Sequence, residues 1–331
     1  MKTHWRDGGR RDPARMEFDV VSYGRRGPTA PRVFNSTQLA QLSRTAGGAP
    51  EVMVKVTGGG RDGQGVAAHF DYVGRKGQLE IETDDGQLLA EQHLGKRLVE
   101  DWDLDIYAKR IDRRWLTKNQ VRRIPKLVHN ITLSMPAKTD AQKVLAAARA
   151  FATEQFALKH RYALALHTDT PHPHVHLTVK AESEEGQRLY IRKATLRQWR
   201  ADFARHLREQ GIEANATPRA VRWQRPSHKP DGQFRAEQRG ASTVLRQRVK
   251  GIVKDVLSGT EVSEAGKAKL EQTRQQITTD WKRSLGIVLA QGQQGLALQI
   301  ARFIRSVPAV RTDREELTIQ ITAQAATKVR T

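Results

Sequence analysis

Residues Leu166–Thr178 have the sequence LHTDTPHPHVHLT and hold four of the 11 histidines of the chain. The run RYALALH ends at His167, and the run HVHLTVKA that follows alternates polar and apolar residues. This period of two predicts a strand with His174 and His176 on one face. If the two runs pair as a hairpin, His167 lies opposite His174 on that same face. The sequence therefore predicts that three imidazoles converge on one point.

Neutral imidazole is a good ligand for divalent transition metals. Three protein ligands leave coordination positions open, which is typical of a catalytic site. We therefore expect His167, His174 and His176 to bind a divalent metal, with Mg, Mn and Zn not distinguishable. Asp169 would orient a ligand histidine or accept a proton, and His172 would support a ligand or face DNA. The alternative is a hairpin with unrelated, partly exposed histidines.

The net charge of +21 indicates a polyanionic partner, with nucleic acid first and an anionic membrane surface second. The absence of cysteine excludes disulfides, Cys-ligated zinc and a Cys nucleophile, and it fits a reducing cytoplasm. No run of about 18 apolar residues is present, so we expect no membrane insertion. The basic N-terminal segment lacks the apolar region of a secretory signal.

A dense basic run, Lys109–Lys126, surrounds a tryptophan. Interleaved cations and an aromatic ring suit a single strand, because phosphates attract Lys and Arg while unstacked bases need a ring face. The alternative is a solvated surface. The candidate DNA contacts are Lys109, Arg110, Arg113, Arg114, Trp115, Arg122 and Arg123.

The pattern along the chain predicts an α+β domain over residues 51–215 and a helical region over 241–331. Residues 1–50 are expected to form a basic, disordered arm, and residues 216–240 a basic linker. Capping-box spacing occurs at Thr139 with Gln142 and at Thr312 with Glu315. The expected elements are a strand from Glu51, a helix within 65–77, a hairpin with a turn at Asp85–Gly86, a strand at 127–136, a helix at 139–160 and a helix at 193–211.

The stretch HTDTPHPHVHLTV resembles the three-histidine motif of conjugative relaxases, or mobilisation nucleases, in particular the type that nicks T-DNA borders. AHFDYVGRKGQLEIE resembles the nucleophile segment of that family. The resemblance covers roughly residues 51–215. It implies an antiparallel sheet flanked by helices, with the histidines on central strands. The long N-terminal arm and the C-terminal helices have no counterpart in it, and no GxxxxGK[ST] motif indicates an appended helicase.

By this resemblance Tyr72 is the nucleophile that attacks the scissile phosphate. His167, His174 and His176 are the metal ligands, and Asp169 assists the site. Arg75 and Lys76 follow the tyrosine and would favour its phenolate form. Tyr162 and Tyr190 are rival nucleophiles in strand-like contexts, and a structural role for the Tyr72 ring is the alternative.

The expected function is therefore a site- and strand-specific relaxase that forms a 5′-phosphotyrosyl adduct at a transfer origin. Its expected partners are single-stranded origin DNA, accessory relaxosome proteins and the coupling protein of a type IV secretion system. We expect a cytoplasmic protein that travels with the transferred strand. Two rivals remain: a metal-dependent phosphodiesterase that uses bound water, and a non-catalytic DNA-binding protein whose metal only staples a hairpin.

Overall fold

The computed structural model describes residues 33–104, 125–224, 231–260 and 266–329, together with residues 262 and 264. Residues 48–216 form one compact unit, and residues 217–331 form a second with the residues up to Gly47. Each unit is described by itself. None of the helices in these described ranges combines the length and the apolar character that a membrane crossing requires.

The first unit is built on an antiparallel sheet of six strands in the order β1-β4-β6-β5-β2-β3. The strong period-two pattern of the central runs explains this sheet, because alternate residues meet different helices on its two faces. The α+β prediction is confirmed. The strands are β1 (Met53–Gly58), β2 (Ile81–Thr83), β3 (Leu88–Leu89), β4 (Val128–Ser134), β5 (Tyr162–His167) and β6 (His174–Lys180).

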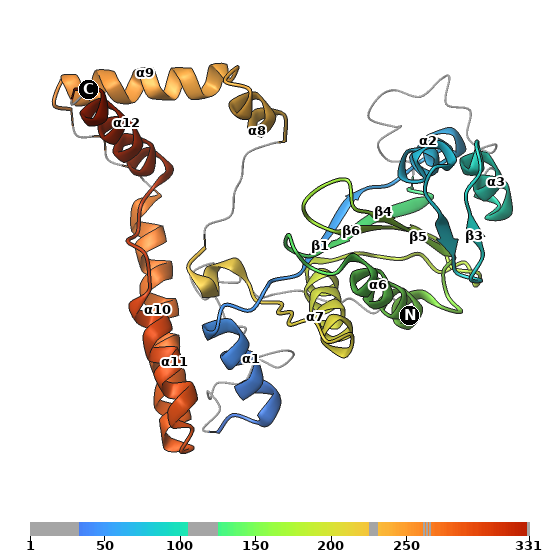
Figure 1. The fold of residues 1–331 in the computed structure, drawn as a ribbon, viewed down its shortest axis with the longest axis horizontal. Helices are drawn as coiled ribbons and strands as arrows, with labels where there is room; N and C mark the ends of the chain where they lie inside the picture. The colour runs from blue at the N-terminus through green and yellow to red at the C-terminus, as the bar shows by residue number, and fades with distance from the viewer. Residues whose placement is uncertain are drawn as a thin grey trace, which may run out of the picture. The chain divides into compact units, whose positions relative to one another are not determined.

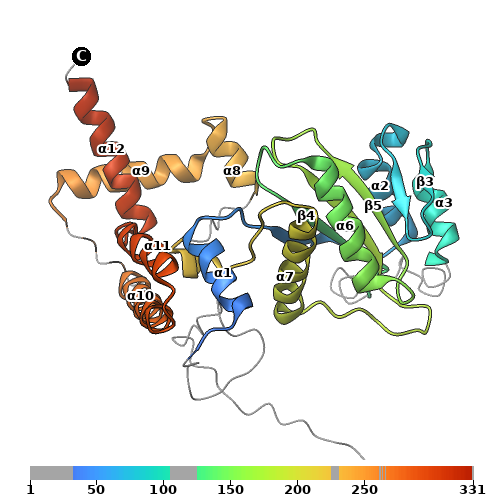
Figure 2. The ribbon, with the colours of Figure 1, turned by 60° about the horizontal axis from the view of Figure 1, so that its bottom comes forward.

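Helices cover both faces of the sheet (Figure 1). α6 (Ala141–Phe156) and α7 (Lys193–Glu209) lie side by side over one face, as Figure 2 also shows. They bury a core around Phe151 and Phe203, both fully buried. Truncating a buried phenylalanine to alanine typically costs about 3–5 kcal/mol.

The other face of the sheet carries α2 (Gly63–Val73) and α3 (Leu94–Asp101). Their separate core contains Phe70, whose ring packs edge-on against Trp102 at 5.3 Å between centroids. The functional residues discussed below belong to this face.

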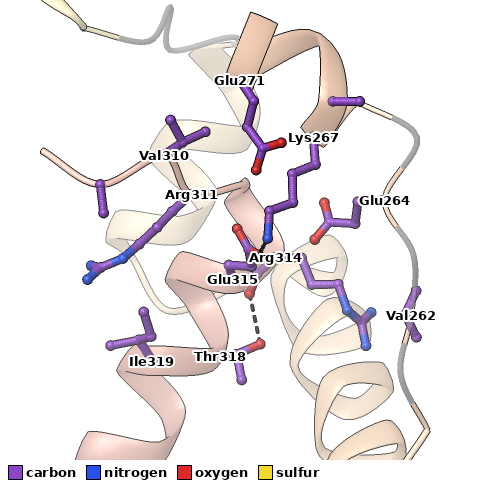
Figure 3. A pocket seen from close by; sticks show the side chains of 12 residues that line it. Val262, Glu264, Lys267, Glu271, Val310, Arg311, Arg314, Glu315, Thr318 and Ile319 are labelled. Carbon is purple, nitrogen blue, oxygen red and sulfur yellow. Dashed lines mark hydrogen bonds and ion pairs between the residues drawn. The ribbon is translucent and has the colours of Figure 1, made fainter. Parts of the chain in front are cut away.

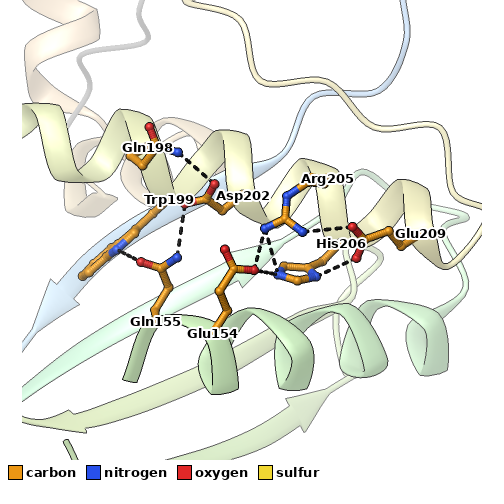
Figure 4. A network of polar contacts seen from close by, with 8 residues as sticks. All are labelled: Glu154, Gln155, Gln198, Trp199, Asp202, Arg205, His206 and Glu209. Carbon is orange, nitrogen blue, oxygen red and sulfur yellow. Dashed lines mark hydrogen bonds and ion pairs between the residues drawn. The ribbon is translucent and has the colours of Figure 1, made fainter. Parts of the chain in front are cut away.

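A polar network joins α6 to α7 away from the sheet (Figure 4). His206 is 6 % exposed, and its ring nitrogens lie 2.7 Å from Glu154 and 2.9 Å from Glu209. Arg205 donates to the same two carboxylates, at 2.5 and 2.9 Å. Hydrogen bonding from Arg205 lowers the pKa of both carboxyl groups. The network therefore fixes the register of the two helices that support the sheet.

The start of α6 differs from the sequence prediction by one residue. Thr139 does not cap the helix; its hydroxyl donates to the carbonyl of Pro136 at 2.8 Å. Asp140 caps the helix instead, because its carboxylate accepts from the backbone of Gln142 and Lys143. A carboxylate at the N-cap is also favoured by the helix dipole.

The second unit is helical, as expected for the C-terminal region. A cluster of aromatic rings holds it together, with Phe303 tilted against Trp223 and edge-on to Trp281. The predicted capping box of the last helix is present, since Thr312 and Glu315 exchange hydrogen bonds of 2.8 and 3.1 Å. The helices are α1 (Ser36–Ala46), α8 (Asp231–Gln238), α9 (Thr243–Leu257), α10 (Lys267–Ala290), α11 (Gln294–Arg305) and α12 (Asp313–Val329), with a short 3-10 turn η3 (Arg219–Arg222).

The prediction of a disordered arm over residues 1–50 was wrong for residues 34–46. Asn35 and Gln38 form a capping box that opens α1. Phe34 and Leu42 are buried in the aromatic cluster of the second unit. The apolar residues of this segment are few, so the sequence shows little periodicity, but burial against α11 stabilises the helix. Residues 1–32 lie outside the described ranges.

A cavity of about 760 Å³ lies in the second unit and is lined by charged side chains from α10 and α12 (Figure 3). Two of its cations are paired within the protein: Lys267 bonds to Glu315 at 2.6 Å, and Arg314 to Asp255 at 2.5 Å.

Candidate active site

Strand pairing brings the three predicted ligand histidines together. In the β5–β6 ladder His167 lies opposite His174, and Ala165 opposite His176. The centroids of the three imidazole rings are 4.5 to 5.3 Å apart, and one nitrogen from each ring lies within 4.8 Å of the others. Two nitrogens bound to one ion are at most about 4.2 Å apart. Small side-chain rotations would therefore bring the three rings onto one cation.

Hydrogen bonds set which nitrogen of each ring carries the proton. A carbonyl oxygen can only accept, so a ring nitrogen that faces one must be protonated. Nδ1 of His174 faces the carbonyl of His172 at 3.0 Å, which leaves its Nε2 lone pair free. Nε2 of His167 faces the carbonyl of Val73 at 2.7 Å, which leaves its Nδ1 lone pair free to accept. His167 and His174 thus each keep one nitrogen with the lone pair that a metal requires.

Burial keeps two of these rings neutral. Burial, and then the charges of the neighbouring histidines, lower the pKa of His176 to about 3. Burial also lowers the pKa of His167, which is only 1 % exposed. Neutral imidazole is the form that binds metals, so the donor set fits a divalent transition metal.

Tyr72 lies on the last turn of α2, facing the same side of the sheet. Asp62 caps the start of this helix by accepting from Gly65 at 2.6 Å. The helix ends at Val73, and Gly74 is its C-cap. The Tyr72 ring is 57 % exposed, and its centroid lies 6.4 Å from that of His176 in an edge-on arrangement. An exposed ring on the rim of the histidine cluster is accessible to a polymer substrate.

A close contact with α3 positions α2. Gly95 of α3 lies against the backbone of Ala67, where a Cβ atom would come within 2.1 Å of the carbonyl oxygen. The amide of Gly95 also donates to the carboxylate of Asp71, at 3.1 Å. The helix that carries Tyr72 is thus held at its middle and near its end.

Directly after α2, the backbone enters a left-handed turn. Arg75 (φ 50°) and Lys76 (φ 55°) both adopt positive φ, followed by Gly77 (φ 89°). Such a conformation is uncommon for residues with a side chain and costs about 1–2 kcal/mol each. The turn directs the two side chains differently, since Arg75 is half-buried in the site whereas Lys76 is exposed.

The guanidinium of Arg75 connects the nucleophile segment to the histidine strands. Its Nη2 lies 3.2 Å from Nδ1 of His167 and forms an ion pair with the carboxylate of Asp169. Its central carbon lies 5.1 Å from the centroid of the Tyr72 ring, within the range of a cation–π contact. Arg75 therefore touches three of the residues that the sequence singled out.

Asp169, His172 and the basic run are the other predicted site residues. Asp169 is exposed and bonds to Arg75 rather than to a histidine. His172 is exposed and contributes its backbone carbonyl to His174. The candidate DNA contacts Lys109, Arg110, Arg113, Arg114, Trp115, Arg122 and Arg123 lie outside the described residues.

The two rival tyrosines lie elsewhere. Tyr162 is 6 % exposed in the core beneath α6, and its hydroxyl lies 3.2 Å from that of Thr153. Tyr190 is 73 % exposed in the segment that precedes α7. Tyr162 therefore has the structural role that its strand context indicated.

A fourth histidine at the site was not predicted. His69 lies on α2 three residues before Tyr72, and its ring is edge-on to His176 at 6.4 Å between centroids. Its Nε2 is buried and has no hydrogen-bond partner among the described residues. Burial lowers its pKa. The i, i+3 spacing to Tyr72, which places both on one helix face, was the available sequence signal.

Comparisons with known proteins give one family match and one structural match. Residues 84–212 match the family model described as relaxase, MobA/VirD2-like, nuclease domain. The matched range contains the three histidines and begins after Tyr72 and Arg75. A solved structure described under vancomycin resistance transfer in Staphylococcus aureus aligns with 11 % identity and a TM-score of 0.30, covering 51 % of this chain and 99 % of that one. No curated protein matches.

Proposed function

We propose, from the match of residues 84–212 to the MobA/VirD2-like relaxase nuclease domain, that the chain is a site- and strand-specific DNA relaxase acting at a transfer origin. The observation that carries the proposal is that an exposed tyrosine, Tyr72, meets the three-histidine cluster on one face of the sheet. A nucleophile beside a Lewis-acid site is the arrangement that phosphoryl transfer needs.

In the proposed reaction the phenolic oxygen of Tyr72 attacks the phosphorus of one phosphodiester. The Oη–P bond forms and the P–O3′ bond breaks, so the leaving oxygen takes up a proton as a free 3′-hydroxyl. The product is a 5′-phosphotyrosyl adduct. The new ester retains the energy of the old bond, so the step is reversible and needs no ATP.

His167, His174 and His176 would hold the divalent cation, which when bound supplies Lewis-acid stabilisation of charge on the non-bridging oxygens. An all-imidazole donor set suits a transition metal better than magnesium. Asp169 would hold Arg75, and His172 would orient His174 through its carbonyl. Lys76 and the basic run at 109–126 would contact phosphates. These assignments rest on the contacts described above and on the resemblance of the motifs.

The remaining proposals concern partners and organisation. The +21 charge supports binding of single-stranded origin DNA. We propose a nuclease domain at residues 51–215 followed by a helical C-terminal region. Accessory relaxosome proteins, a type IV coupling protein and a cytoplasmic location are what relaxase function would require.

The direct test is a covalent adduct. The full-length protein is incubated with labelled single-stranded oligonucleotides of its transfer region and Mn²⁺, and analysed on denaturing gels. We expect a labelled adduct that survives SDS, with the nucleotide on the peptide that contains Tyr72. Tyr72→Phe should abolish the adduct, whereas the control Tyr190→Phe, at another exposed tyrosine of the same unit, should not.

Each rival predicts a different result. Cleavage without any adduct, retained in Tyr72→Phe, would favour the water-using phosphodiesterase. Tight DNA binding with no cleavage in any metal would favour the non-catalytic protein. His176→Ala and EDTA should both abolish nicking and leave DNA binding intact, whereas His160→Ala, outside the cluster, should retain nicking.

A further inference from the structure

We propose that Arg75 and the divalent cation compete for Nδ1 of His167, and that cation binding transfers the Arg75 guanidinium to the DNA phosphate. The inference rests on the proposed function and assigns a substrate-binding role within it. It starts from one contact: Nη2 of Arg75 lies 3.2 Å from Nδ1 of His167.

The opposite nitrogen of His167 is already committed. Nε2 donates to the carbonyl of Val73 at 2.7 Å, a buried bond to the last residue of α2. The ring is 1 % exposed, which opposes a flip. A cation must therefore bind through Nδ1, whose single lone pair now accepts from Arg75. One lone pair cannot serve both partners, so the two binding events exclude each other.

A displaced guanidinium needs another anionic partner. Arginine stays charged at every accessible pH, and its planar fork matches two phosphate oxygens at once. Asp169 already shares Nη2 and is more than half exposed, so it can accompany the movement without leaving a buried charge. The guanidinium also lies 5.1 Å from the Tyr72 ring. A phosphate attacked by Tyr72 would lie within reach of Arg75.

The backbone permits this movement without disturbing α2. The helix ends at Val73, and Arg75 begins the left-handed turn that follows Gly74. The Arg75 side chain is half-buried and can rotate outward about its own torsions. Lys76 shares the left-handed conformation and the positive charge but is exposed. It therefore provides a matched control.

The first experiment measures Mn²⁺ affinity of the full-length protein by calorimetry. Removing a competing charge-assisted hydrogen bond of about 1.5 kcal/mol should raise affinity by roughly tenfold. We expect Arg75→Ala to bind Mn²⁺ at least about fivefold more tightly than wild type, and Lys76→Ala to stay within about twofold. Arg75→Lys keeps the charge but lacks the planar fork, so it should also bind more tightly. A general repulsion would instead leave Arg75→Lys equal to wild type.

The second experiment measures linkage to DNA. Fluorescence anisotropy with a labelled single-stranded oligonucleotide of mixed sequence is recorded with and without Mn²⁺. Mn²⁺ should raise the DNA affinity of wild type by at least about threefold, because it releases the guanidinium. The gain should be at least halved in Arg75→Ala. Lys76→Ala would lose a phosphate contact, so it should weaken DNA binding equally with and without Mn²⁺ and retain the gain.

Three outcomes would overturn the inference or its premise, and they are distinguishable. Mn²⁺ affinity that is unchanged or weaker in Arg75→Ala, with wild-type binding intact, would refute the competition alone. An equal Mn²⁺ effect on DNA affinity in wild type and Arg75→Ala would refute the transfer to phosphate. No Mn²⁺ binding by wild type, or binding unaffected by His176→Ala, would refute the metal assignment in the proposed function and the competition with it.

Discussion

Replacing Lys76 by glycine should stabilise the protein, although the substitution removes a side chain next to the candidate nucleophile. Lys76 has φ 55° and ψ 41°, in the left-handed region. This conformation costs a residue with a Cβ about 1–2 kcal/mol, and glycine is free of that cost. Glycine loses about 0.5–1 kcal/mol more on folding because its unfolded chain is more flexible. The expected net gain is about 0.5–1 kcal/mol.

The assay is thermal unfolding followed by circular dichroism. For a unit of about 170 residues, 1 kcal/mol corresponds to about 2–4 °C in Tm, so Lys76→Gly should raise Tm by about 1–4 °C. Lys76→Ala is the control, because it removes the same charge and side chain but retains the Cβ and its strain. The difference in Tm between the two variants therefore measures the cost of the left-handed backbone at residue 76.

Equal melting temperatures for the glycine and alanine variants would refute the reasoning. They would mean that residue 76 does not occupy the left-handed region, or that the turn relaxes without cost. The direction of the Arg75 side chain would then lose its backbone explanation as well.

Three further predictions concern the helix contact, acid stability and DNA affinity. Gly95→Ala should destabilise the protein by about 1–3 kcal/mol and lower nicking, since a Cβ would collide with the Ala67 backbone; unfolding and nicking assays check both. Burial, and then nearby cations, lower the pKa of His129 to about 4, so its contribution to stability is present above pH 6.5 and lost as pH falls toward 4. His129→Gln should reduce the difference in unfolding free energy between pH 7 and pH 4.5 by about 1–2 kcal/mol, after allowance for solvent screening. Urea unfolding at the two pH values measures this difference, and an unchanged difference would contradict the prediction. Replacing four arginines of the Lys109–Lys126 run by alanine should reduce the log–log salt slope of single-strand binding by about 0.7 per lost phosphate contact, and an unchanged slope would indicate a solvated face. The four are Arg113, Arg114, Arg122 and Arg123.

The histidine cluster could be predicted from the sequence because it depends only on local rules. His174 and His176 share a face by strand periodicity, and a short turn sets His167 opposite His174. The hairpin at Gly86 was likewise predicted from its turn residues, and α2 ends within the predicted range 65–77. Patterns of a few residues were sufficient for each of these.

Contacts between distant segments could not be predicted in the same way. The cap of α6 is Asp140, because two neighbouring residues both suit an N-cap and the hydroxyl of Thr139 instead donates to the carbonyl of Pro136. The helix α1 depends on burial of Phe34 and Leu42 against residues more than 170 positions away. His69 has an ordinary place on an amphipathic helix, and only the fold shows that His176 lies beside it.

The turn after Tyr72 is where local preference and observed structure disagree most, and the disagreement supports a function for it. Glycine is the residue that local rules favour at positive φ, yet positions 75 and 76 are occupied by arginine and lysine. A sequence selected for stability alone would relieve that strain, so the strain needs a compensating gain elsewhere. The contacts that Arg75 makes from this turn with His167 and Asp169 identify the gain. The strained turn thus places Arg75, which follows the nucleophile closely in sequence, beside the histidines. A substitution that relieves the strain and moves Arg75 should therefore raise stability and lower nicking activity.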